Sequence, residues 1–248
     1  MQTRKALMIS AAVAALTMTA PTAQAADAYV SMFGGGSFLE KPHMSGVSKT
    51  HTTTTLFFTS KQSVDTSFKT GYVLGGNVGV DWGTFRTEVE LGFHHNKSAS
   101  KAHLKTSYSV NGYAFDGTTY SSTSRDATVA SDLKLSAWSL MANAWYDFHD
   151  ILPYGITPYV GGGIGFAQVK ISGMLDTIKL HEKDSTVFAW QIGSGVSFPI
   201  TNSMKLFADY RYFAADSVPL KLSPGFHGGD ITTDFDAHTV LFGLRVNL

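Results

Sequence analysis

The chain of 248 residues contains no cysteine, and this absence removes several kinds of chemistry at once. Disulfides, thiol nucleophiles and zinc sites with cysteine ligands all need a residue that the chain lacks. A lipid anchor on an N-terminal cysteine is missing for the same reason. Any fold and any function must therefore be built from other side chains.

Net charge is absent as well, because 19 basic side chains balance 19 acidic ones and charged residues make up 15% of the chain. Such a chain has no overall field to attract nucleic acid or to hold it on an anionic membrane surface. We therefore expect no nucleic-acid partner. Glycine (24), phenylalanine (17) and tyrosine (10) are plentiful instead, which is an unusual composition for a soluble protein of this size.

Long apolar runs are missing beyond residue 25, where no stretch approaches the ~20 residues that a membrane-spanning helix needs. The first 25 residues have the features of an export signal: the basic residues Arg4 and Lys5, the apolar run ALMISAAVAALTM, and the small residues AQA at 23–25. We predict a cleaved signal peptide at 1–25 and a mature chain from Ala26. That chain either is soluble outside the inner membrane or crosses a membrane as strands.

What the chain does contain is a repeated alternation of apolar and polar residues. At its end Val240, Phe242 and Leu244 alternate with smaller or polar residues, which is the period of a β-strand. Eight segments share this pattern. We predict strands at 27–39, 70–82, 85–97, 131–148, 157–170, 186–199, 204–214 and 236–248.

The connections between these segments alternate in length. Long ones begin at residues 40, 98, 171 and 215, whereas short ones have the sequences GT, HDILPYGI and ITNSM. Short turns at one end and long loops at the other are typical of outer-membrane barrels, with the turns in the periplasm and the loops outside the cell. The pattern predicts an all-β fold for residues 26–248: an eight-stranded antiparallel transmembrane β-barrel with four long extracellular loops.

The two faces of the strands favour lipid over water as the outer solvent. In 85–95 one face carries Phe85, Val89 and Leu91, and the other carries charged residues. A soluble barrel would crowd the large side chains into a narrow lumen, whereas a membrane barrel turns them outward to lipid. We also expect aromatic residues near strand ends to form interfacial girdles. These are Trp82, Phe85, Trp145, Tyr146, Phe148, Tyr154, Tyr159, Phe198 and Tyr212.

Three stretches carry a family resemblance: GITPYVGGGIGFA at 155–167, FAWQIGSGVSFPITNSMKLFADYRYF at 188–213, and the terminal HTVLFGLRVNL. They resemble the eight-stranded outer-membrane β-barrel proteins of Gram-negative bacteria, the OmpA-like barrel or surface-antigen group of alphaproteobacteria. The resemblance implies a location in the outer membrane and no peptidoglycan-binding domain. It implies little about activity, because this fold carries adhesins, anchors, channels and lipid enzymes.

Charges on the predicted inner face could line a conducting pore or could pair across the lumen and close it. They are Asp81, Arg86, Glu88, Glu90, Asp209, Arg211 and Arg245. An eight-stranded barrel is just filled by its side chains, and buried charges need partners, so we favour closure. The predicted lumen network consists of Glu88, Glu90, Asp209, Arg211 and Arg245.

The sequence contains little that indicates a catalytic, metal or cofactor site. The histidines lack metal-binding spacings, and His94 and His95 must point to opposite faces of a strand. We expect solvated histidines at His43, His51, His95, His103, His181 and His227. No serine has a histidine at a supportive spacing. The glycines of GGGIGF fall in a strand rather than at a helix start, so they do not predict phosphate binding. We expect no enzyme activity, no metal and no cofactor.

The Ser/Thr-rich runs at 48–67 and 118–132 are polar and prone to form strands. They prolong hairpins beyond the bilayer or present a surface to other molecules. The predicted function is a surface antigen or adhesin-like protein whose loops mediate contact; the alternatives are a narrow porin-like channel and, third, a lipid-modifying enzyme. Expected partners are outer-membrane lipid and lipopolysaccharide, the barrel-assembly machinery during insertion, and host or neighbouring surface molecules. We expect a monomer.

Overall fold

The computed structural model describes residues 26–40, 43–53, 56–112, 123–175, 178–220 and 231–248. The predicted signal peptide lies outside these residues, so it stays a prediction. Within the described residues, no helix is long and apolar enough to cross a membrane.

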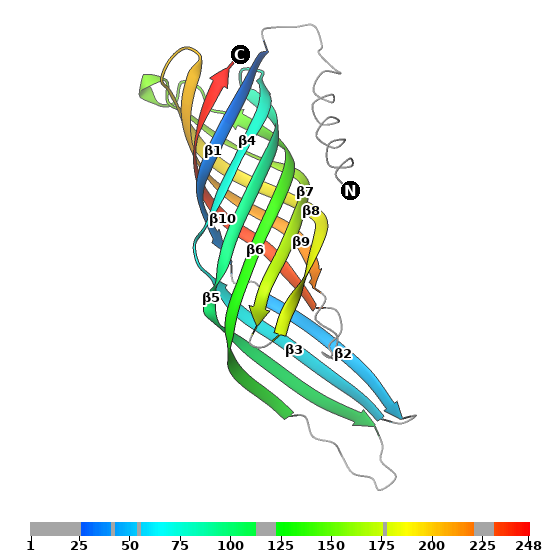
Figure 1. Cartoon of the computed structure of the whole chain (residues 1–248). Helices are drawn as coiled ribbons and strands as arrows, with labels where there is room; N and C mark the ends of the chain where they lie inside the picture. Colours follow the sequence, from blue (N-terminus) through cyan, green and yellow to red (C-terminus); the bar gives the residue numbers. More distant parts are fainter. Residues whose placement is uncertain (1–25, 41–42, 54–55, 113–122, 176–177, 221–230) are drawn as a thin grey trace.

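Eight antiparallel strands close into a barrel (Figure 1). Around the ring they follow the order β1, β4, β5, β6, β7, β8, β9 and β10, and β10 pairs back onto β1. Closure gives every strand two partners, so no unpaired edge faces lipid. The bounds are β1 Asp27–Leu39, β4 Gly71–Asp81, β5 Phe85–Gly112, β6 Thr123–Asp147, β7 Thr157–Leu175, β8 Ile178–Pro199, β9 Met204–Leu220 and β10 Ile231–Asn247.

The eight predicted strands are confirmed, but several run further than predicted. Strand β5 continues past residue 97 to Gly112, and β6 begins at Thr123 rather than at residue 131. The predicted loop at 40–69 contains two further strands, β2 (His43–Thr53) and β3 (Leu56–Phe68). Their residues are mostly polar and β-prone, so they lack the apolar alternation that marks the barrel strands.

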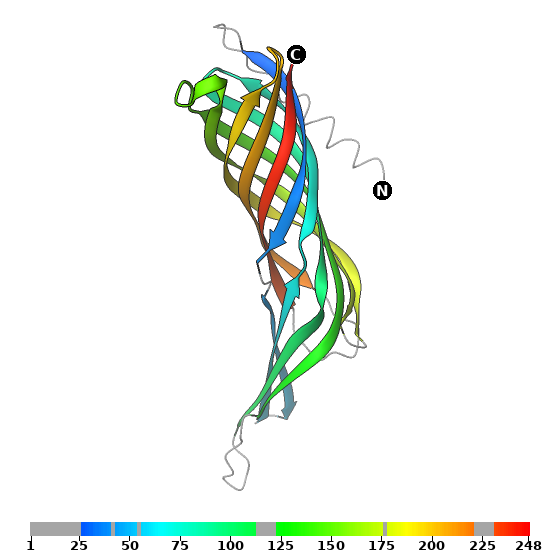
Figure 2. The ribbon, with the colours of Figure 1, turned by 90° about the vertical axis from the view of Figure 1, so that its left-hand side faces the viewer.

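The hairpin of β2 and β3 lies against the distal part of β5, which pairs β3 from Leu56 to Thr66. Strand β6 pairs the other side of β5 over Thr123–Ala130. These strands form a sheet that extends the barrel wall away from the end that carries the C-terminus (Figure 2). The prediction that the Ser/Thr-rich runs prolong hairpins is confirmed for their described residues.

The end that carries the C-terminus has tight turns. Gly83 adopts a φ of 88°, and its N–H donates to Oδ1 of Asp81 at 2.9 Å. The backbone N–H of Leu248 donates to the carbonyl oxygen of Ala28 at 2.8 Å. The final segment closes the barrel, because β10 pairs with the first strand, β1, and so completes the ring.

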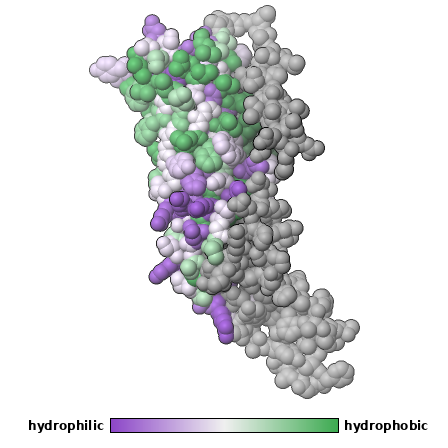
Figure 3. Space-filling view, viewed as in Figure 1, coloured by the Kyte–Doolittle hydropathy of each residue, from purple (hydrophilic) through white to green (hydrophobic). Residues whose placement is uncertain are grey.

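Apolar side chains cover the outer surface of the barrel. Met32 is 69% exposed, Phe242 65% and Ile192 54%, whereas neighbouring residues on each strand point inward. Figure 3 shows hydrophobic residues gathered over the barrel and hydrophilic residues farther along the molecule. Such an exposed belt suits lipid rather than water.

The interior differs from the prediction in one respect, because it also holds large aromatic residues. Trp145 and Tyr159, predicted for the interfacial girdle, point into the lumen and are 2% and 3% exposed. An alternation sets which residues share a face, and at these two positions the phase of the strand overrides nearness to the strand end. Trp82, Phe85, Tyr146, Tyr154 and Phe198 are exposed as predicted.

Candidate functional site in the barrel lumen

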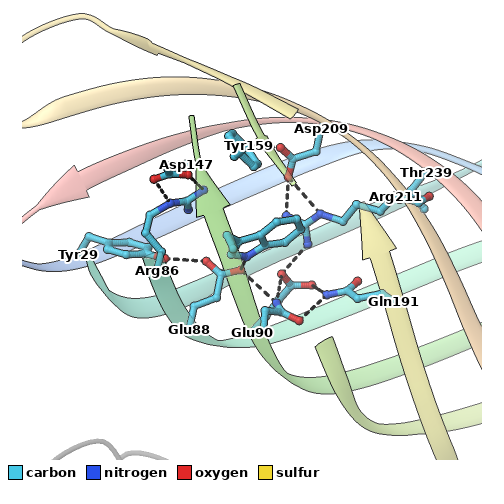
Figure 4. A network of polar contacts seen from close by, with 12 residues as sticks. Tyr29, Arg86, Glu88, Glu90, Asp147, Tyr159, Gln191, Asp209, Arg211 and Thr239 are labelled. Atoms are coloured by element: carbon cyan, nitrogen blue, oxygen red, sulfur yellow. Dashed lines mark hydrogen bonds and ion pairs between the residues drawn. The ribbon is translucent and has the colours of Figure 1, made fainter. Parts of the chain in front are cut away.

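A network of charged side chains crosses the lumen, with Arg211 of β9 at its centre (Figure 4). Its Nη1 donates to Oε2 of Glu90 at 2.6 Å. Its Nη2 and Nε both donate to Oδ2 of Asp209, at 2.5 and 3.0 Å. Arg211 is 3% exposed, so these charge-assisted hydrogen bonds replace the water that the guanidinium lost.

Glu88 and Glu90 occupy successive inward positions on β5, so their carboxylates lie in neighbouring layers. Glu88 accepts hydrogen bonds from Oη of Tyr29 at 2.8 Å and from Nε1 of Trp145 at 2.8 Å. Asn143 joins the two layers, because its Nδ2 lies 3.0 Å from Oε1 of Glu88 and 3.1 Å from Oε2 of Glu90. Both carboxylates are therefore held by donors from other strands.

A second ion pair lies nearer the turns. Nε and Nη2 of Arg86 donate to the two carboxylate oxygens of Asp147 at 2.7 and 2.9 Å. The guanidinium of Arg86 also lies 4.7 Å from the ring centroid of Tyr159, whose hydroxyl donates to Asp209. Tyr159 thus connects the two ion pairs of the lumen.

The structure brings together four of the five predicted network residues, Glu88, Glu90, Asp209 and Arg211, and leaves Arg245 apart. The guanidinium of Arg245 lies over the rings of Tyr29 and Phe207, at 4.8 and 5.8 Å from their centroids. Its Nε is buried and has no hydrogen-bond partner. Arg245 therefore borders the network without an ion pair within it. Asp81 pairs directly with the inward-facing Arg86 at the turn end of β4, and its Oδ1 accepts a hydrogen bond from the N–H of Gly83.

Sequence reasoning missed Asp147, Asn143 and Gln191. Nε2 of Gln191 donates to Oδ1 of Asn143 at 2.8 Å and so extends the network to β8. All three occupy inward positions of their strands. The sequence signal for Asn143 and Gln191 is an uncharged polar residue at an inward position of its strand.

Positive and negative charges nearly balance among the lumen residues that the structure describes. Three guanidiniums (Arg86, Arg211, Arg245) face four carboxylates (Glu88, Glu90, Asp147, Asp209), and each of these residues is at most 5% exposed. A buried charge is tolerated when it is paired and hydrogen-bonded. The arrangement is suited to closing the barrel and holding its strands in register.

A second, apolar layer fills the lumen toward the long loops. Leu135, Val169, Phe213 and Phe235 are each at most 1% exposed and belong to one packed cluster. The ring of His94 lies 4.9 Å from that of Phe213, and its Nδ1 has no hydrogen-bond partner. The lumen is thus filled by two kinds of side chain in succession.

The histidines whose side chains the structure describes do not gather at one site. His94 points into the lumen, while His95 points outward and lies 2.9 Å from Oγ of Ser136 through Nδ1, so the predicted opposite faces are confirmed. His103 lies on the outer face near Thr128. Nε2 of His238 lies 3.0 Å from Oε1 of Glu40. Among the described residues, no group of three or more His, Asp or Glu side chains could hold a metal ion. The side chains of His43, His51, His181 and His227 lie outside the described part.

Comparison with known proteins shows which family the chain belongs to. The profile of the family described as "Surface antigen" matches residues 28–218, which is more than half of the chain. The chain belongs to the surface antigen family. Together with the closed barrel and its apolar outer belt, this membership places it in the outer membrane of a Gram-negative bacterium, as a surface barrel.

Two relatives and one solved structure show the range of similarity. Outer membrane protein PagN of Salmonella typhimurium is 33% identical over 107 residues, which cover 40% of this chain and 42% of PagN. Putative adhesin RC1281 of Rickettsia conorii is 24% identical over 199 residues, covering 75% and 72%. The crystal structure of OprG from Pseudomonas aeruginosa has a TM-score of 0.49 and 12% identity, covering 90% and 97%. The chain thus spans less than half the length of PagN.

Proposed function

We propose that the protein is a surface-contact protein: a closed, non-enzymatic, monomeric barrel that holds an adhesive sheet outside the outer membrane. The function is binding rather than transport or chemistry. The observation that carries the proposal is the continuation of the wall strands beyond the lipid belt into a sheet of β2, β3, β5 and β6.

The filled lumen supports the first half of the proposal. A small barrel that conducts solutes needs a hydrated path, whereas the charged residues here are at most 5% exposed and are followed by an apolar layer. Lumen charges that pair with one another stabilise the barrel and leave function to the loops.

The extended sheet supports the second half. Strands β5 and β6 pair as far as Tyr108 and Thr123, well past Phe93 and Trp138 on the outer belt. A sheet fixes its exposed side chains more rigidly than a flexible loop, which lowers the entropy cost of binding. The name of the Rickettsia relative, putative adhesin, agrees with a contact role.

The test is attachment of bacteria that display the chain to cultured host cells. In the test variant a short Gly-Ser linker replaces residues 43–66, which removes the β2/β3 hairpin and keeps the ring. We expect attachment to fall at least tenfold, toward that of cells without the protein. The control variant Thr84→Ala changes only an exposed turn at the other end of the barrel. Full attachment by the hairpin variant, with its barrel folded in the outer membrane, would contradict the proposal.

The rival function is a narrow channel for small solutes, and it makes an opposite prediction. We expect no steady conductance when the purified barrel is inserted into planar bilayers. Reproducible conductance that changes when Glu88 or Arg211 is substituted would replace the contact proposal. Product formation from labelled lipopolysaccharide would instead favour a lipid enzyme. Assistance from the barrel-assembly machinery and the identity of host or neighbouring surface partners stay predictions.

A further inference from the structure

The outer face of β5 changes its chemistry at one height of the barrel. From the turn end this face carries Leu91 and Phe93, and the next residues on the same face are His95, Lys97 and, farther on, Lys101. Leu91 is 47% exposed, as expected for a side chain in lipid, and both lysines are exposed. The apolar belt therefore ends between Phe93 and Lys97 on this strand.

The neighbouring strand β6 changes at the same height. Trp138 pairs with Phe93, and their ring centroids lie 4.7 Å apart. Four residues back on the same face, Lys134 pairs directly with Lys97. The aromatic pair marks the membrane interface, where tryptophan rings gather in outer-membrane barrels. The two lysines lie just outside it.

The pair of Lys97 and Lys134 needs an explanation, because like charges directly opposite one another destabilise a sheet. Within the part of the chain that the structure describes, no carboxylate forms an ion pair with either lysine. Lys69 adds a third cation, since its backbone N–H donates to the carbonyl oxygen of Lys97 at 2.8 Å and it is exposed. Asp132, two residues from Lys134 on the same face, is the nearby acid.

The cations Lys69, Lys97, Lys101 and Lys134 form what we name the lysine patch. Among the described side chains of these segments of β5 and β6 and at residue 69, four positive charges stand against the carboxylate of Asp132, which leaves the patch with a net charge of +3. Hydrophilic residues gather beyond the hydrophobic part of the barrel in the view that faces β5 and β6 (Figure 3). The chain as a whole is neutral, so this local excess is a feature of the fold.

We propose that the lysine patch binds the phosphate groups of lipopolysaccharide in the outer leaflet. The ligand chemistry is a phosphate in the headgroup plane, and the source is a lipid because the patch adjoins the aromatic edge of the lipid-facing belt. Phosphates seated between Lys97 and Lys134 would turn a repulsive pair into a bridged one. The acyl chains would lie along the apolar belt below. This inference does not depend on adhesion by the distal sheet.

The test uses the full mature chain folded in zwitterionic detergent micelles, with bisphosphorylated lipid A as the titrant. The variant K97Q/K134Q should bind lipid A about 30-fold more weakly, since each lysine near an anionic lipid surface contributes about fivefold. The control K105Q/K205Q removes two lysines away from the aromatic edge and should bind within about twofold of the wild type. Without lipid A, the melting temperature of K97Q/K134Q should equal or exceed that of the wild type, because repulsion is relieved.

Three results would overturn the inference. One is equal binding of dephosphorylated lipid A, which would assign the contact to acyl chains alone. A second is binding of heparin or inorganic phosphate as tight as that of lipid A, which would make the patch a site for soluble anions. The third is an equal loss of lipid A affinity in both double variants, which would show that binding depends on the total charge of the protein and not on the lysine patch. Loss of adhesion in the hairpin variant bears on none of these outcomes.

Discussion

Replacing Arg211 with glutamine should destabilise the barrel strongly, because the substitution leaves two buried carboxylates without their cation. The guanidinium makes three hydrogen bonds to Glu90 and Asp209, and the carboxylates have no route to solvent at 4% exposure each. Removing one partner of a buried ion pair costs about 3–5 kcal/mol of folding free energy.

Two further variants separate the charge from the geometry. Arg211→Lys keeps the charge but loses the forked guanidinium, so we expect about 1–3 kcal/mol of destabilisation. In the double variant E90Q/R211Q the unpaired carboxylate of Glu90 is gone, and Asp209 keeps the hydroxyl of Tyr159 as a donor. The two single losses should therefore not add, with a coupling of about 1–3 kcal/mol.

The assay is reversible urea unfolding of the barrel in phospholipid vesicles, followed by tryptophan fluorescence. Trp145 lies against the guanidinium of Arg211, with its ring centroid 5.0 Å away, so its share of the emission from the four tryptophans reports on this layer. A free energy of unfolding for Arg211→Gln within about 1 kcal/mol of the wild type would refute the reasoning. That result would mean that water reaches the carboxylates and that the lumen is hydrated rather than closed.

Three other predictions follow from the same structure. Arg245→Met should change the free energy of unfolding by less than about 1 kcal/mol in that assay, because Arg245 has no ion pair among the described residues and a buried charge is removed. A loss as large as that of Arg211→Gln would reveal a hidden partner. Gly163→Val should cost about 1–3 kcal/mol or prevent folding, since a β carbon there overlaps Oδ1 of Asn143, whereas the lipid-facing Ala144→Val should be tolerated; the heat-induced gel shift measures both. On intact cells an impermeant thiol reagent should label Lys105→Cys but not Ser203→Cys, and the reverse would contradict the orientation; no native cysteine interferes.

Local pattern predicted the barrel well because a strand's side chains alternate strictly. The eight segments, the outward direction of Leu91 and Trp190 and the inward direction of Glu88 and Arg211 all follow from that period of two. The extension of β5 to Gly112 is not predicted, because most residues beyond Lys97 are polar and lack the large apolar side chain at every second position that marks the barrel strands. Trp145 and Tyr159 lie near strand ends, which favours an interfacial girdle, but the phase of their strands turns both side chains into the lumen.

The amino-acid sequence alone determined that charges of both signs face inward, since this depends only on neighbours along one strand. Which charges meet was decided by the tertiary structure. Arg211 and Glu90 are 121 residues apart, and they pair because the closed, tilted ring turns β5 and β9 toward each other across the lumen. Pairing of the adjacent strands β5 and β6 gives Arg86 the carboxylate of Asp147. Closure of β10 onto β1 leaves Arg245 against Tyr29, with Phe207 of β9 beside it. The stagger between strands that sets these partners is a property of the whole ring, and no single segment contains it.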